Sequence, residues 1–135
     1  MSNHSEVRFK WLRGMYIYTI VGAGGFGLGM LFAPGLIALI FGIPFEEPIV
    51  YGIAGSTFLA FAIASIFGLS SPLKYVPVLF LQLCYKSVWV LFIGIPLIFT
   101  GQFPLYAILP AILFATYIIG DIIAIPFKHL FAKDK

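Results

Sequence analysis

The sequence predicts an all-α membrane protein, with four transmembrane helices in a bundle and a short interfacial helix after the first span. The chain of 135 residues is 61% hydrophobic and 10% charged, whereas soluble domains are about 45–50% apolar and about 25% charged. Proline, glycine and polar residues divide it into apolar stretches close to the length of about 20 residues that crosses a bilayer. The length leaves no room for a second domain of ordinary size, so residues 1–135 form one four-span domain.

The first span is expected at about residues 15–33, behind an amphipathic lead-in that carries Trp11 at headgroup level. We expect it to remain uncleaved, because its apolar run is longer than the 7–15 residues of a signal peptide. Pro34 ends the span. The next apolar stretch, at about 35–42, is too short to cross and is predicted to be a helix lying at the interface.

The other three spans are expected at about 49–69, 75–99 and 104–125. The second is stopped by two serines and Pro72, and the fourth by Pro126. A short polar turn at 100–103 separates the third from the fourth. Four crossings place both chain ends on the same side of the membrane.

Basic residues fix the predicted orientation. With this order of spans, one side carries Arg8, Lys10, Arg13, Lys74, Lys128, Lys133 and Lys135. The loops on the other side carry no lysine or arginine. The positive-inside rule therefore predicts cytoplasmic termini, and we expect the plasma membrane of a bacterium or archaeon. The distribution suits membrane lipids as partners and gives no basic, aromatic-interleaved surface for nucleic acid.

Small residues predict where the helices approach one another. They recur every four positions in the second span, and the first span has the same spacing; the residues are Gly25, Gly29, Gly52, Ser56, Ala60 and Ala64. Such stripes allow close helix packing. The two spans are expected to pack on each other, or one stripe serves a homo-oligomer.

The most informative polar chemistry lies in the third span, where Lys86 stands almost at the centre of an apolar segment. Gln82 and Trp89 share its helix face, and Tyr85 lies beside it. A charged group at this depth is expensive and should face other helices or a wet cavity. Asp121 in the fourth span is the intramembrane acidic candidate, with Tyr117 one turn before it; a direct or water-bridged pair with Lys86 is feasible.

Two interpretations of this cluster stay open. In one, it binds an anionic or carbonyl-bearing ligand or relays protons; in the other, it is a structural device that fixes helix register. Thr116 is a further candidate for the lining of a cavity there. No cofactor is predicted, although bound lipid or quinone would fit.

Other candidate motifs favour structural roles. A G-x-G-x-x-G string begins at Gly22, but it lies inside a membrane span instead of between a strand and a helix, so we assign it to helix packing. Cys84 has no second thiol, and His4 and His129 have no partners at metal-binding spacing, so no metal site is predicted. The adjacent Glu46 and Glu47 are expected in a solvated loop.

The layout resembles the small four-helix DoxX-like membrane families. The similarity lies in the glycine-rich first span that ends in MLFAPGLIALIFGIP, the following YGIAGSTFLAFAIASIFGL and the two further spans. Some members resemble subunits of quinone-linked oxidoreductases, so the resemblance implies an association with membrane redox systems.

Three functions compete. The first is a non-catalytic membrane protein, either an accessory subunit of a larger complex or a binder of lipid or another hydrophobic ligand; the scarcity of polar chemistry favours it over an enzyme. The second is a redox component or enzyme acting on a quinone-like or sterol-like substrate, in which Lys86 donates to a carbonyl oxygen. The third is a small proton-coupled transporter.

Overall fold

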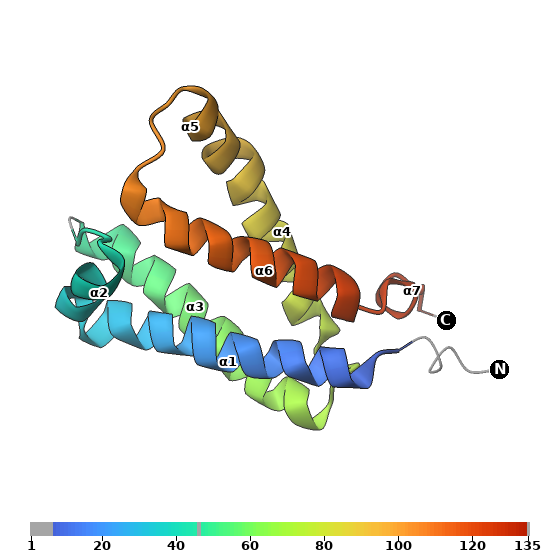
Figure 1. Cartoon of the computed structure of the whole chain (residues 1–135). Coiled ribbons are helices and arrows are strands. Elements are labelled where there is room, and N and C mark those ends of the chain that lie inside the picture. Colours follow the sequence, from blue (N-terminus) through green and yellow to red (C-terminus); the bar gives the residue numbers. More distant parts are fainter. Residues whose placement is uncertain (1–6, 46, 135) are drawn as a thin grey trace.

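The computed structural model describes residues 7–45 and 47–134, and the described residues are helical without strands (Figure 1). The elements in chain order are α1 (Phe9–Phe32), α2 (Pro34–Phe41), α3 (Pro48–Ser70), α4 (Val76–Trp89), the π-helical turn η2 (Val90–Gly94), α5 (Ile95–Phe99), the 3₁₀ turn η3 (Leu105–Ala107), α6 (Ile108–Ala124) and α7 (Phe127–Leu130).

Four helical stretches among the described residues are long and apolar enough to cross a membrane, as predicted; they are Phe9–Phe32, Pro48–Ser70, Val76–Phe99 and Leu105–Ala124. The main difference from the expected ranges is at the first, which begins at Phe9 because the amphipathic lead-in continues the helix. Large apolar side chains point outward, for example Leu39 at 81% exposed and Phe99 at 85%. Such a surface indicates an integral membrane protein.

The packing of α1 against α3 is the closest helix contact, and it uses a different face from the predicted one. A Cβ at Gly27 would meet the backbone of Gly55, and a Cβ at Gly24 would meet Ala62. By contrast, Gly25 and Gly52 have open space around them. Ser56 and Ala60 are exposed and Ala64 is half-buried, while Gly29 packs against Ile37 of α2. The two helices pack on each other as predicted, but most of the predicted small residues do not lie on the faces that meet.

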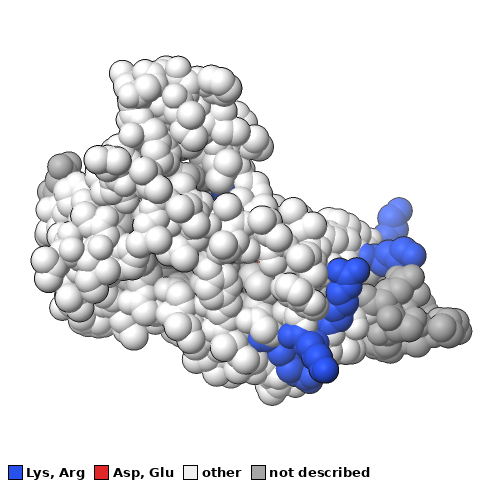
Figure 2. All heavy atoms as spheres, in the orientation of Figure 1, with Lys and Arg blue, Asp and Glu red and all other residues white. Residues whose placement is uncertain are grey.

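The other two long helices complete the structure on one side of this pair. α6 packs against both α1 and α4, and the two chain ends lie near each other (Figure 1). Basic side chains gather at this same end (Figure 2). The chain therefore runs in the antiparallel order that four crossings require. Of the basic residues predicted at this end, Lys135 lies outside the described residues.

The third span is not a continuous α-helix. Pro96 has no N–H and its ring clashes with the carbonyl four residues earlier, and the helix widens just before it into the π-helical η2, where the Ile95 N–H donates to the Val90 carbonyl. Beyond this turn α5 has no buried residue, and it diverges from α6 (Figure 1). The outer part of the third span is thus an arm with few contacts to the remaining helices.

Local sequence signals account for the start of α3. The Glu47 carboxylate accepts hydrogen bonds from the Ile49 N–H at 2.8 Å and the Val50 N–H at 2.6 Å, and Pro48 occupies the first helical turn. Glu47 is therefore an N-cap and not simply a solvated loop residue; Glu46 lies outside the described residues. A short helix α2 forms where an interfacial one was predicted, from Pro34 to a left-handed Gly42 with φ of 72°.

Candidate ligand-binding site

Lys86 is buried in α4, with 2% of its surface exposed, and its amine is surrounded by aromatic rings. The Nζ atom lies 4.0 Å from the ring centre of Tyr117, 4.4 Å from that of Phe114 and 5.1 Å from that of Tyr85. Aromatic faces attract a cation. The predicted inward orientation of this lysine is therefore what the structure shows.

The Tyr117 ring is held rigidly beneath the amine by Tyr18 of α1. The two rings stack with centres 4.0 Å apart and planes 5° apart, and the Tyr117 hydroxyl donates to the Tyr18 carbonyl at 2.8 Å. Gly22 provides the space, because a Cβ there would collide with that hydroxyl. The first glycine of the G-x-G-x-x-G string thus shapes the site instead of binding a phosphate.

Asp121 lies one helical turn from Tyr117 on the same face of α6 and is fully buried. Its carboxylate accepts from the Gln82 Nε2 at 3.1 Å to Oδ2 and 3.5 Å to Oδ1. The same amide donates to the Thr19 hydroxyl of α1 at 3.3 Å, and that hydroxyl donates to the Met15 carbonyl at 2.8 Å. Gln82 therefore ties three helices together through hydrogen bonds in the interior.

Of the two arrangements that the sequence left feasible for Lys86 and Asp121, a direct pair and a water-bridged one, the direct pair is not present among the described residues. Among the described residues, the hydrogen bonds to the carboxylate come from Gln82, and the contacts of the Lys86 Nζ are with aromatic rings. The physical reason is the arrangement of depths: α4 and α6 are antiparallel, so Asp121 meets the Gln82 level and Tyr117 meets the Lys86 level, one turn further along. Polar hydrogen bonding and aromatic contact thus occupy successive layers.

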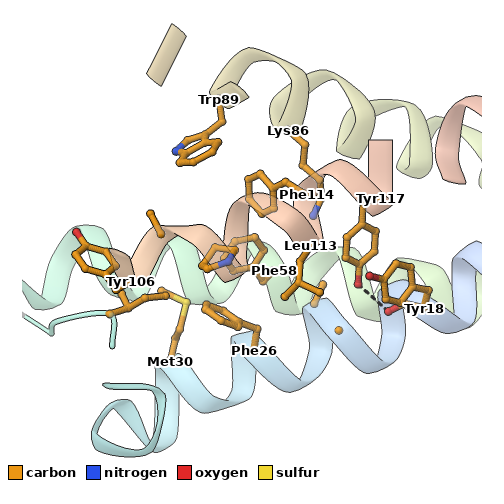
Figure 3. Close-up of a pocket in the computed structure, with 15 residues that line it drawn as sticks. Tyr18, Phe26, Met30, Phe58, Lys86, Trp89, Tyr106, Leu113, Phe114 and Tyr117 are labelled. Atoms are coloured by element: carbon orange, nitrogen blue, oxygen red, sulfur yellow. Dashed lines mark hydrogen bonds between the residues drawn. The ribbon is translucent and has the colours of Figure 1, made fainter. Parts of the chain in front are cut away.

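A cavity of about 300 Å³ begins at the Lys86 amine (Figure 3). Its walls come from α1, α3, α4, η3, α6 and the segment that follows α2, and they are almost entirely apolar and aromatic. The lining residues are Tyr18, Gly22, Ala23, Phe26, Met30, Ile43, Phe58, Lys86, Trp89, Tyr106, Ala107, Pro110, Leu113, Phe114 and Tyr117. In the space-filling view a hollow lies between the α5 arm and the body of the protein (Figure 2).

The cavity has its polar end at Lys86, where the two tyrosines have no free proton to offer. The Tyr117 hydroxyl donates to a backbone carbonyl. The Tyr18 hydroxyl is 2.7 Å from that of Thr116, whose own proton goes to the Leu113 carbonyl at 2.7 Å, so Tyr18 is the donor of that pair. The Lys86 amine is consequently the charged donor that faces the cavity (Figure 3).

Of the other predicted site residues, Trp89 lines the cavity, whereas Tyr85, Gln82 and Asp121 do not. Trp89 lines the cavity and packs against Phe114, with ring centres 5.4 Å apart. Tyr85 lies behind the amine against Phe61, and its buried hydroxyl has no partner in the described part of the chain. Gln82 and Asp121 lie below the cavity and do not line it.

Most of the cavity lining was not predicted, and neither were the contributions of Tyr18, Thr19, Gly22 and Phe114 to the site. Aromatic and small residues are frequent throughout such spans, so their types carry no signal of this role. The one available clue was spacing: Phe114 precedes Tyr117 by three residues and therefore shares its face of α6.

No other chemical centre is evident among residues 7–45 and 47–134. Within them, no group of three histidine, cysteine or acidic residues could hold a metal ion. Cys84 is exposed on α4. His4 lies outside the described residues.

Comparisons with known proteins give no further assignment. No family model, no curated protein and no solved structure matches the chain. The DoxX-like resemblance therefore stays a prediction.

Proposed function

We propose that this protein is a non-catalytic binder of one hydrophobic ligand, which it holds in the cavity above Lys86 with a hydrogen-bond-accepting oxygen on the Lys86 amine. The observation that carries the proposal is the position of that amine: it faces an apolar cavity of about 300 Å³, and within residues 7–45 and 47–134 its contacts are with aromatic rings and not with a carboxylate. A bound oxygen would supply the partner that the protein itself does not place there.

Energetics favours a ligand over an empty site. An ammonium group in an apolar environment is costly unless it is paired or hydrogen-bonded. Three aromatic faces offset part of this cost, by about 0.5–2 kcal/mol each in desolvated settings. They accept no conventional hydrogen bond, so the donor capacity of the amine is available to an oxygen from outside the chain.

The shape of the cavity restricts the ligand to a small amphiphile. Its charged end is at Lys86, near the middle of the third span, and its lining continues to Met30, Ile43 and Tyr106, at the ends of the spans away from the chain termini. A bilayer phospholipid keeps its headgroup at the surface and would not place it at this depth. A single-chain or single-ring molecule whose polar end goes in first fits the arrangement.

Quinone or sterol chemistry is the second candidate, because aromatic walls such as Phe26 and Phe58 suit a flat ring. Turnover would need a proton partner within reach of the ligand. Asp121, the predicted partner, lies below the cavity and is hydrogen-bonded to Gln82. This arrangement favours binding over catalysis. The proposal is compatible with four further expectations from the sequence, although the cavity does not imply them. They are membership in a larger complex, a homo-oligomer, an interfacial position of α2 and cytoplasmic termini.

Native mass spectrometry of gently purified protein tests the proposal. Wild type should carry one small amphiphile, and Lys86→Met should lose it while keeping its fold. The matched control is Lys74→Met, because Lys74 also lies over a tyrosine ring, at 5.8 Å from Tyr75, but is exposed and outside the cavity. A bare wild type, or an adduct retained by Lys86→Met, would contradict ligand binding at this amine.

A further inference from the structure

We infer that Gln82 is a positioning residue that keeps the Lys86 amine available to the ligand by holding Asp121 in a separate hydrogen bond. The inference rests on the proposed function, because it explains how a buried lysine and a buried aspartate coexist one helical turn apart without neutralising each other in a direct pair.

The geometry uses both N–H groups of the Gln82 amide. One N–H of Nε2 is directed at the Asp121 Oδ2, 3.1 Å away, and the other at the Thr19 hydroxyl, 3.3 Å away. Gln82 is fully buried, so water does not compete for these bonds. Anchoring at Thr19 fixes the amide from the α1 side, which keeps it against the carboxylate.

Lys86 would reach Asp121 if the amide were absent. In an α-helix side chains lean toward the helix N-terminus, which for Lys86 is toward Gln82 and the level of Asp121. Opposite charges in a low-dielectric interior attract strongly. A lysine side chain is long enough to span one turn of about 5.4 Å. In the structure the Asp121 carboxylate instead accepts from the amide of Gln82, which lies on the same helix one turn before Lys86.

The hydrogen bond from Gln82 to Asp121 therefore decides which partner the Lys86 amine can take. With Asp121 held by Gln82, the amine contacts only aromatic faces among the described residues and faces the cavity. If it were paired with Asp121, it would point below the cavity and would have little attraction for a ligand oxygen. Gln82 thus determines whether the lysine is a binding group or a structural ion pair.

The test measures the Lys86 amine directly, by its rate of labelling with phenyl isothiocyanate in lipid nanodiscs, located by peptide mapping. Gln82→Met should slow labelling about tenfold, because a charge-assisted hydrogen bond to Asp121 then holds the amine. The double variant Gln82→Met/Asp121→Asn should label within about threefold of wild type, since no carboxylate remains to hold the amine. Asp121→Asn alone should also label at the wild-type rate.

A purely structural role for Gln82 gives a different pattern of labelling rates. The Lys86 amine of the double variant would then label no faster than that of Gln82→Met. That result, or wild-type labelling of Gln82→Met, overturns the inference. If Gln82→Met does not fold, Gln82→Asn and its double variant with Asp121→Asn take its place, since the shorter side chain withdraws the amide from the carboxylate.

The labelling measurement does not require the natural ligand to be identified. A bare wild type in native mass spectrometry overturns the proposed function whatever the labelling rates are. Unchanged labelling in Gln82→Met, with a Lys86-dependent adduct on wild type, overturns only the role of Gln82.

Discussion

The Lys86 amine lies 4.0 Å from the centre of the Tyr117 ring, and Tyr18 stacks against the other face of that ring at 4.0 Å (Figure 3). This sandwich links α4, α6 and α1 at the floor of the cavity. It places a cation beside apolar walls, and in the described part of the chain no carboxylate contacts that cation.

The Tyr117 ring should matter more than its hydroxyl. Tyr117→Phe loses one hydrogen bond to the Tyr18 carbonyl and should cost about 0.5–1.5 kcal/mol of stability. Tyr117→Leu also loses the stack and the cation contact, and should cost about 1–3 kcal/mol more. Unfolding in detergent, followed by circular dichroism, measures both. Equal stability of the two variants would show that neither ring contact contributes.

Two glycines of the same string should respond oppositely to alanine. Gly22→Ala displaces Tyr117, because its Cβ would collide with the hydroxyl, and should cost about 1–3 kcal/mol by overpacking. Gly25→Ala has open space around it and should be neutral or slightly stabilising, since alanine favours helix. The unfolding temperatures of the two variants make the comparison. If Gly22→Ala proves as stable as Gly25→Ala, the site does not depend on this close approach.

The Asp121 carboxylate should be replaceable by an amide but not by a methyl group. Asp121→Ala leaves one N–H of the buried Gln82 amide unpaired and should cost about 1–3 kcal/mol. Asp121→Asn retains an acceptor oxygen at the same place and should cost less. Thermal unfolding of both variants, beside wild type, gives the order. The reverse order would mean that an acceptor oxygen at this position does not stabilise the interior.

The π-helical turn should depend on Pro96. Pro96→Ala restores an N–H that can donate to the carbonyl four residues earlier, so η2 should revert to α-helix. Amide hydrogen exchange across residues 90–97 should then slow. Pro77→Ala is the control, because Pro77 lies in the first turn of α4, where a missing N–H costs nothing. Unchanged exchange in Pro96→Ala would indicate that packing, and not the proline, sets the turn.

Hydropathy and breaker residues were enough to place the four long helices, because span length is a strong constraint in apolar sequences. The burial of Lys86 was predictable for the same reason: a charge in mid-span has to face inward. Gln82 followed from its spacing to Lys86, Asp121 from being an acidic residue within a predicted span, and Tyr117 from its spacing to Asp121. These features depend on one helix at a time.

Relations between helices were not predictable in the same way. Lipid is as apolar as the interior, so the sequence of α3 does not mark which face meets α1. The regular stripe that includes Gly52 and Ala60 therefore suggested one face, whereas Gly55 and Ala62 make the contact. The partner of Asp121 depended on the relative depth of two antiparallel helices, and a shift of one turn exchanged Lys86 for Gln82.

The most direct test of ligand binding is an experimental structure of the protein extracted with its native lipids. The account predicts ordered non-protein density along the aromatic walls, with an oxygen within hydrogen-bonding distance of the Lys86 Nζ. A dry cavity closed by side chains, or an amine bonded to Asp121, would contradict it.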